Sequence, residues 1–234
     1  MFHILELRVR IFYVLISFCV TFCFCYYFQV EFFFLVIKPL FQKNYFFFVY
    51  TDLTEAFITF WYISFFLSFF FSIPFTVYQC WCFFLPALYI FEMKFFRNFL
   101  YYGLVLFFSG IVVGYFCVVP IVWNFLLNYV QFNIQFLAKI SNYTIFFLSF
   151  LFFFGLLFEL PLLLFFIVKL QFITTKFLVR KRFWFYFGLL LFAAFITPPD
   201  INIQFFVYLF LVFLYEFSLF LFCYYDNLFK TSSS

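Results

Sequence analysis

A run of twenty-four residues from Ile145 to Val168 contains one ionisable side chain, Glu159. About twenty apolar residues are enough for a helix to cross a bilayer, so this run predicts a transmembrane helix. Pro161 lacks the N–H that would pair with the carbonyl group of Leu157, and we therefore expect a kink there. The alternative for Glu159 is a protonated carboxyl group satisfied by a neighbouring helix. Because an intramembrane acid costs about 2.5–3.5 kcal/mol and usually faces a site or cavity, we favour a functional interpretation.

The composition places the whole chain in the membrane. Hydrophobic residues make up 70% of the 234 and charged residues only 9%, which excludes a soluble domain. Phe occurs 57 times and Gly only five times, a skew toward AT-rich codons that favours an organellar genome. The seven cysteines form no C-x-x-C pair and have no nearby His, so we predict neither a disulfide framework nor a metal site.

Hydropathy predicts an all-α fold with six transmembrane helices in one membrane domain over residues 1–234. The fifth and sixth spans are short, and the fifth is about 22 Å long against about 30 Å of hydrocarbon. Residues 29–55 and 123–142 are expected outside, the first as an interfacial helix. Residues 80–97 are expected as a loop along the inner interface. The predicted spans are 11–28, 56–79, 99–122, 143–168, 183–197 and 205–222.

The distribution of basic residues predicts that both termini lie inside. Ten of the thirteen Lys and Arg residues then fall on the inner side, which satisfies the positive-inside rule. The cluster Lys176, Arg180, Lys181 and Arg182 is interpreted as part of this topology signal. Glu6 and Arg10 form an i,i+4 pair just before the first span.

Two further local patterns concern helix shape and packing. Gly110 and Gly114 form a G-x-x-x-G, which predicts close approach of a helix from the same chain. Pro74 predicts a bend in the second span.

Four motifs in order resemble the TatC family of Sec-independent protein translocases, in a mitochondrially encoded form. One departure from the family pattern is Ala87, where Gly is usual. The motifs are His3-Ile-Leu-Glu6-Leu-Arg8; Thr54-Glu55-Ala56-Phe57 with Pro74 and Tyr78-Gln79-Cys-Trp81; Phe158-Glu159-Leu-Pro161; and Thr197-Pro198-Pro199-Asp200 with Gln204 and Leu214-Tyr215-Glu216.

The resemblance implies a cup-shaped receptor for twin-arginine signal peptides that moves folded proteins with the proton-motive force. It implies single-span partners similar to TatA and TatB, further copies of the chain, and the mitochondrial inner membrane, with a plastid or bacterial inner membrane as the alternative. It also implies three groups of residues: signal-peptide contacts at Glu6, Arg8, Gln79 and Glu92; intramembrane or partner contacts at Glu159, Pro161 and Glu216; and structural positions at Pro74, Pro86, Pro198, Pro199 and Asp200.

The residues themselves agree with this function. Two guanidinium groups need carboxylates in a partly dehydrated setting, and Glu6 and Glu92 are the acids expected at the inner surface before the third span. No nucleophile, nucleotide or metal motif is present, so we predict no enzyme activity, no cofactor and no nucleic-acid partner.

Two alternatives come from other classes of membrane protein. The first is a subunit of a respiratory or ATP-synthesising complex, which would need ionisable residues strung across several spans. The second is a small-solute transporter, which often shows repeated halves that this chain lacks.

Overall fold

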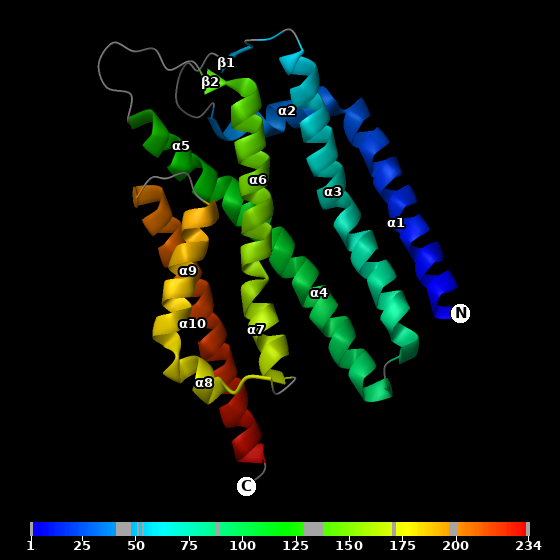
Figure 1. The fold of residues 1–234 in the computed structure, drawn as a ribbon, viewed down its shortest axis with the longest axis vertical. Helices are drawn as coiled ribbons and strands as arrows, with labels where there is room; N and C mark the ends of the chain where they lie inside the picture. The colour runs from blue at the N-terminus through cyan, green and yellow to red at the C-terminus, as the bar shows by residue number, and fades with distance from the viewer. Residues whose placement is uncertain are drawn as a thin grey trace. The chain divides into compact units, whose positions relative to one another are not determined.

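The structure is a computed structural model that describes residues 2–40, 48–50, 52, 54–87, 89–128, 138–169, 172–196 and 201–232. Helices form nearly all of it, and Figure 1 labels them. The elements are α1 (Phe2–Tyr27), α2 (Gln29–Ile37), β1 (Phe48–Val49), α3 (Glu55–Phe84), α4 (Ile90–Val113), α5 (Val119–Asn128), β2 (Ala138–Lys139), α6 (Ile140–Phe158), α7 (Leu160–Lys169), α8 (Thr175–Arg180), α9 (Arg182–Ile196) and α10 (Ile201–Ser232), with 3₁₀ turns at Lys38–Leu40 and Leu85–Ala87 and a π-helical turn at Gly114–Val118.

The predicted all-α membrane architecture is confirmed. Within the described ranges, five helical segments have the length and hydropathy of membrane spans, and α9 is a shorter apolar helix of 15 residues. The sixth crossing and the side on which each terminus lies stay predictions. The five segments are Leu5–Tyr27, Glu55–Phe84, Glu92–Trp123, Ile140–Lys169 and Ile203–Phe222.

The helices form two compact units. Unit 1 comprises residues 1–104 and 114–151, and unit 2 comprises residues 105–113 and 152–234. The division falls within α4 and within α6. Each of these two helices therefore has one part in unit 1 and the other part in unit 2.

In unit 1, α1 packs antiparallel to α3 through rings and small polar residues. Phe18 lies edge-on against Phe65, with ring centroids 5.5 Å apart. The Thr21 hydroxyl donates to the carbonyl oxygen of Ser68 at 3.3 Å, and Ser68 is buried. Small side chains at such positions let two helices approach closely inside a membrane.

The helix predicted between the first two spans is α2, and it is tied into unit 1 at its C-terminal end. Carbonyl groups in the last turn of a helix have no partner within that helix. Tyr115 donates its hydroxyl to the carbonyl oxygen of Leu35 at 2.8 Å, and Tyr143 donates to that of Val36 at 3.1 Å. These two bonds attach α2 to the π-helical turn and to α6.

The loop predicted over Cys80–Arg97 is wrong. α3 continues to Phe84 and α4 begins at Ile90, so a short turn containing Pro86 replaces most of that loop. The aromatic residues that suggested a headgroup-level loop instead pack between the helices, because Trp81 stacks on Phe96 with centroids 5.8 Å apart. α3 remains a single helix through Pro74, and a bend there stays a prediction.

The third predicted span, 99–122, is longer than expected and contains a π-helical turn. Pro120 has no N–H to offer the carbonyl group of Phe116, so we attribute the wider turn at Gly114–Val118 to this missing bond. The effect of Pro120 on the helix is therefore confined to this one turn.

In unit 2, glycine residues allow α4 and α6 to touch. A Cβ built on Gly110 would lie 2.7 Å from the carbonyl oxygen of Phe154, and one on Gly155 would lie 2.6 Å from the ring of Phe107. The close internal packing predicted from G-x-x-x-G is therefore confirmed at Gly110.

Candidate functional site

The start of α1 carries the ion pair that its spacing predicts. Arg10 donates from Nε and Nη2 to Oε1 of Glu6 at 3.1 and 2.5 Å. The Glu6 side chain is 36% exposed and that of Arg10 is 24% exposed. Arg8 is exposed and points away from this pair, as expected for its position in the helix.

The end of α3 lies against this first part of α1. The Cys82 thiol is beside both Arg10 and Tyr78. Gln79, one residue after Tyr78, is half-buried. The antiparallel packing of the two helices therefore brings Glu6 and Gln79 to the same end of unit 1.

Glu92 joins that end because α4 begins directly after the Pro86 turn. Its carboxylate accepts the backbone N–H of Tyr89 at 3.2 Å, and an acid in the first turn of a helix is favoured by the helix dipole. Glu92, Lys94 and Arg97 are all exposed. The sequence-predicted acids Glu6 and Glu92 thus lie at one end of one unit, with a carboxylate open to an incoming cation.

Glu159 occupies a break between two helices in unit 2. Its N–H donates to the carbonyl oxygen of Leu156 at 3.1 Å, and its own carbonyl oxygen accepts from Leu163 at 2.9 Å. α7 begins at Leu160, so Pro161 stands in its first turn, where a missing N–H is tolerated. The half-buried carboxylate accepts no hydrogen bond within the described ranges. The sequence predicted a kink here, and the structure shows a one-residue interruption at Glu159 between α6 and α7.

Glu216 is held inside unit 2 by two residues of α9 that sequence reasoning missed. Tyr186 donates its hydroxyl to Oε1 of Glu216, and Nη2 of Arg182 lies 3.5 Å from Oε2. Arg182 and Tyr186 are four residues apart and share a helical face. That spacing is the signal that could have identified them as a pair of partners for one acid.

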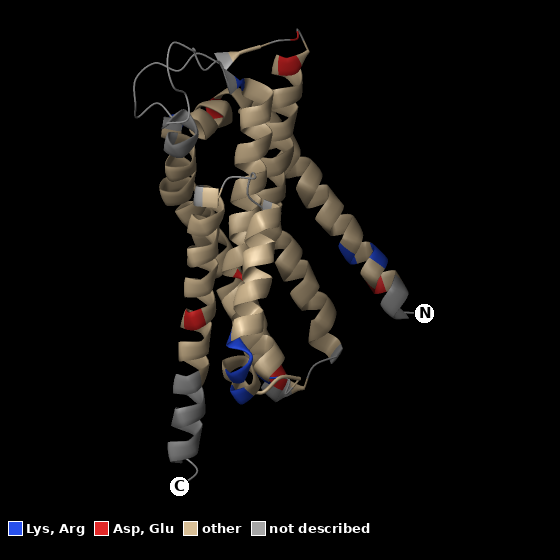
Figure 2. Ribbon diagram, turned by 60° about the vertical axis from the view of Figure 1, so that its left-hand side comes forward, with Lys and Arg blue, Asp and Glu red and all other residues tan. Residues whose placement is uncertain are grey.

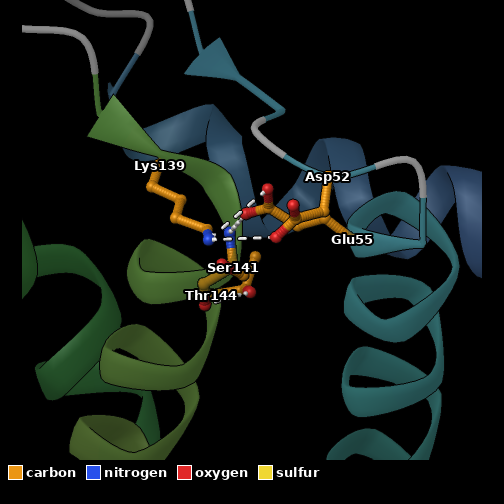
Figure 3. Close-up of polar contacts among 5 residues, drawn as sticks. All are labelled: Asp52, Glu55, Lys139, Ser141 and Thr144. Atoms are coloured by element: carbon orange, nitrogen blue, oxygen red, sulfur yellow. Dashed lines mark hydrogen bonds and ion pairs between the residues drawn. The ribbon is translucent and has the colours of Figure 1, made fainter.

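A polar cluster at the other end of unit 1 was not predicted (Figure 3). Nζ of Lys139 lies 3.8 Å from Oδ2 of Asp52 and 3.9 Å from Oε2 of Glu55. Glu55 is only 4% exposed, and its Oε1 accepts the N–H of Ser141 at 3.2 Å. We call Asp52, Glu55, Lys139 and Ser141 the clasp, because they join the start of α3 to the start of α6.

The clasp is reinforced by a short parallel strand pairing. Phe48 of β1 is opposite Ala138 of β2, and Val49 is opposite Lys139. The Thr144 hydroxyl also donates to the carbonyl oxygen of Ser141 at 3.0 Å (Figure 3). Glu55 belongs to a motif noted in the sequence, but neither its burial nor its partners could be inferred from that motif.

Some predicted residues lie outside the described residues. They are Pro198, Pro199 and Asp200 of the expected turn between the last two spans.

Comparison with known proteins supplies the family. The family described as "TatC: Sec-independent protein translocase protein (TatC)" matches residues 2–209. The chain is 37% identical over 225 residues to an uncharacterised tatC-like protein, ymf16, of Reclinomonas americana, covering 93% of this chain and 85% of that protein. It is 31% identical to the Sec-independent protein translocase protein TatC of Rickettsia prowazekii over 227 residues, covering 93% and 89%.

A solved structure agrees with these relatives. The crystal structure of the twin-arginine translocase receptor TatC in DDM matches with a TM-score of 0.78 and 30% identity, covering 94% of this chain and 98% of that one. These matches decide against a respiratory subunit and a solute transporter, and they place the chain among components of protein transport rather than enzymes. The chain belongs to the TatC family, and it is a multi-span core subunit of a Sec-independent protein translocase.

Proposed function

We propose that this chain is the receptor subunit that binds twin-arginine signal peptides, and that it does so at the end of unit 1 where α1 starts, α3 ends and α4 starts. The observation that carries the proposal is the exposed Glu92 carboxylate at the same end as Glu6 and Gln79. The solved relative that matches this chain is described as a receptor of the twin-arginine translocase.

The chemistry of the two acids suits paired guanidinium groups. An Arg–carboxylate contact can be bidentate, and it is strengthened where water is partly excluded. Glu6 already pairs with Arg10, but an i,i+4 pair of this exposure contributes only about 0.3–0.5 kcal/mol and can yield to an incoming arginine. Gln79 supplies a half-buried amide at the same end of unit 1, and the exposed Arg8 is proposed as a further contact of the signal peptide.

Glu159 is proposed as a second contact, for an inserted signal segment or a partner helix. Its carboxylate is half-buried at a break in an apolar helical segment and accepts no hydrogen bond from the described residues. A polar group so placed favours an incoming polar partner, because leaving it unpaired is costly in hydrocarbon.

The partner proteins, the topology and the host membrane are proposed from the family resemblance. The partners are single-span subunits similar to TatA and TatB, together with further copies of this chain. Residues 1–234 form one domain of six spans with both termini inside, in the mitochondrial inner membrane. The relatedness to ymf16 proteins and the amino-acid composition, which is skewed toward residues with AT-rich codons, support the organellar location.

The test is a double-mutant cycle between the receptor and a signal peptide. Glu92→Gln and Glu6→Ala are each combined with a single Arg→Gln change in the signal, and binding is measured by titration in detergent. Losing one partner of a desolvated charge pair costs roughly 2–5 kcal/mol, so each receptor change should weaken binding by roughly tenfold or more. A Lys–Lys signal should also bind poorly, because an ammonium group lacks the fork geometry of a guanidinium.

The matched control is Glu31→Gln, which removes an exposed acid from α2 in the same unit. It should leave signal binding unchanged. If the coupling energies for Glu92 and Glu6 are both near zero, these acids are surface charges and the proposed binding site must be abandoned.

A further inference from the structure

The short helix α8 is fixed to unit 2 more firmly than a connecting segment needs to be. Thr174 caps its start, since the Thr174 hydroxyl accepts the N–H of Phe177 at 3.3 Å. Leu178 is fully buried in a cluster with Tyr215, Leu219 and Phe222. An isolated helix of six residues would not be stable in water, so these contacts are what hold it in place.

A hydrogen bond from one residue of this cluster fixes the backbone of the same helix. Tyr215 donates its hydroxyl to the carbonyl oxygen of Leu178 at 3.1 Å. Both the side chain and the backbone of Leu178 are therefore held by α10. The face of α8 opposite to Leu178 is thus turned away from α10.

That opposite face carries cations. Lys176 and Arg180 are four residues apart, and each lies about half a helical turn from Leu178. Lys181 follows at the C-cap, and all three side chains are exposed. No ion pair in the described part of the chain involves any of them, whereas the neighbouring Arg182 is paired with Glu216. Figure 2 shows the basic residues gathered on this short helix.

Exposed aromatic side chains border the cations. Phe172 is 78% exposed before α8, and Phe183 and Trp184 are 75% and 65% exposed after it. Trp184 is of the type enriched at the headgroup level of a bilayer, and exposed Phe rings beside basic residues suit the apolar side of the same interface. From Lys169 to Arg182 the chain has five basic residues and no acid, so the surface attracts anions and offers them no competing partner within the segment.

We propose that Lys176, Arg180 and Lys181 form a docking surface for the phosphodiester headgroups of anionic phospholipids, with Phe172, Phe183 and Trp184 seated in the adjacent interface. A topology signal alone requires only the number of charges near a span and no ordered helix to present them. The surface is also bordered by rings suited to a bilayer, which favours lipid over an acidic protein segment.

The test measures lipid selectivity of the purified chain in vesicles of phosphatidylcholine with about one-fifth phosphatidylglycerol. Spin-labelled phosphatidylglycerol and spin-labelled phosphatidylcholine report the fraction of each lipid held at the protein surface. The wild-type chain should favour phosphatidylglycerol. A basic residue near an anionic surface contributes about a five-fold preference, so Lys176→Gln/Arg180→Gln/Lys181→Gln should lose most of it.

Two controls separate charge from fold. The charge-conserving variant Lys176→Arg/Arg180→Lys/Lys181→Arg should keep the preference, and Lys38→Gln, which removes an exposed cation from unit 1, should keep it too. For the wild-type chain itself, high salt should abolish the preference because it screens exposed charges.

Three results would overturn the proposal. The first is a preference for phosphatidylglycerol that is unchanged in the triple Gln variant, and the second is a preference that is insensitive to salt in the wild-type chain. The third is a wild-type chain that shows no preference for phosphatidylglycerol but binds a soluble polyglutamate peptide in phosphatidylcholine vesicles and loses that binding in the triple Gln variant, which would assign the surface to an acidic protein partner.

Discussion

Gly110 lies so close to Phe154 that a Cβ on the glycine would stand 2.7 Å from the Phe154 carbonyl oxygen. A backbone atom cannot move aside as a flexible side chain can, so Gly110→Ala should push α4 away from α6. Overpacking of this kind costs about 1–3 kcal/mol. We expect a lower midpoint of thermal unfolding in detergent.

Gly188→Ala in α9 is the matched control, because nothing lies within 4 Å of a Cβ built there. It should leave the midpoint unchanged or raise it slightly, since Ala is the better helix former. Equal effects of the two substitutions would show that the close approach at Gly110 is not required for stability.

The contacts of the clasp predict which of three substitutions lowers the stability of the protein most and which lowers it least. Glu55→Ala should destabilise most, because it strips the Ser141 N–H of its acceptor at the start of α6, a loss of about 1–3 kcal/mol. Lys139→Ala should cost less, and Asp52→Ala should be nearly neutral because Asp52 is 73% exposed. Chemical unfolding of the three variants in detergent measures the order, and an Asp52 effect as large as that of Glu55 would contradict it.

The six-span arrangement predicts that Lys139 and Arg180 face opposite compartments. Single cysteines at these two positions, in a chain whose native cysteines are replaced, should react with a membrane-impermeant thiol reagent from opposite sides. Reaction of both from the same side would reject the arrangement.

The 15-residue helix α9 is shorter than the hydrocarbon thickness, so the bilayer should be thinner beside it. Inserting four Leu residues after Leu191 adds about 6 Å and roughly one turn, which keeps the helical faces nearly in register. Transport should fall more than the amount of protein in the membrane. Gly188→Leu, which adds a Leu to the same helix without lengthening it, at a position where nothing lies within 4 Å of a Cβ, serves as the control. Unchanged transport in the α9 variant would reject the thinning hypothesis.

Glu159→Leu should leave the protein stable or stabilise it, because the change removes the cost of keeping a carboxyl group in an apolar segment. Transport should fall, since the proposed contact for the signal or partner is lost. Accumulation is measured by immunoblot of membranes, and transport is measured per molecule of receptor. Loss of accumulation with normal transport per molecule would identify Glu159 as a structural residue.

The sequence indicated a distortion of the helix next to Glu159, where the structure interrupts it, because such a distortion depends on chemistry within one turn. Pro161 removes a specific N–H, and no distant residue is needed to know which bond is lost. The prediction of a loop over Cys80–Arg97 was wrong because it depended on packing between helices, which local chemistry does not reveal. Aromatic residues at a helix–helix contact, such as Trp81 against Phe96, have the same composition as residues at a headgroup boundary. Only the packing distinguishes them.

The clasp could not be predicted because its partners are chosen in three dimensions. Glu55 and Ser141 are 86 residues apart, and several other cations and helix starts were available to that acid. For Glu216, the partner Tyr186 is 30 residues away on the preceding helix, and its spacing to Arg182 becomes informative only once α9 is known to pack on α10.

The clasp also sets an order of events during biosynthesis. Glu55 leaves the ribosome 86 residues before Ser141, an interval on the order of ten seconds at ordinary elongation rates. Throughout that interval the nascent chain holds an acid without the backbone N–H and the lysine that receive it in the finished fold. Closure of β1 onto β2 and of Glu55 onto Ser141 therefore marks completion of unit 1. A product that ends before Lys139 therefore lacks both the Ser141 N–H and the Lys139 ammonium group that Glu55 contacts in the complete chain.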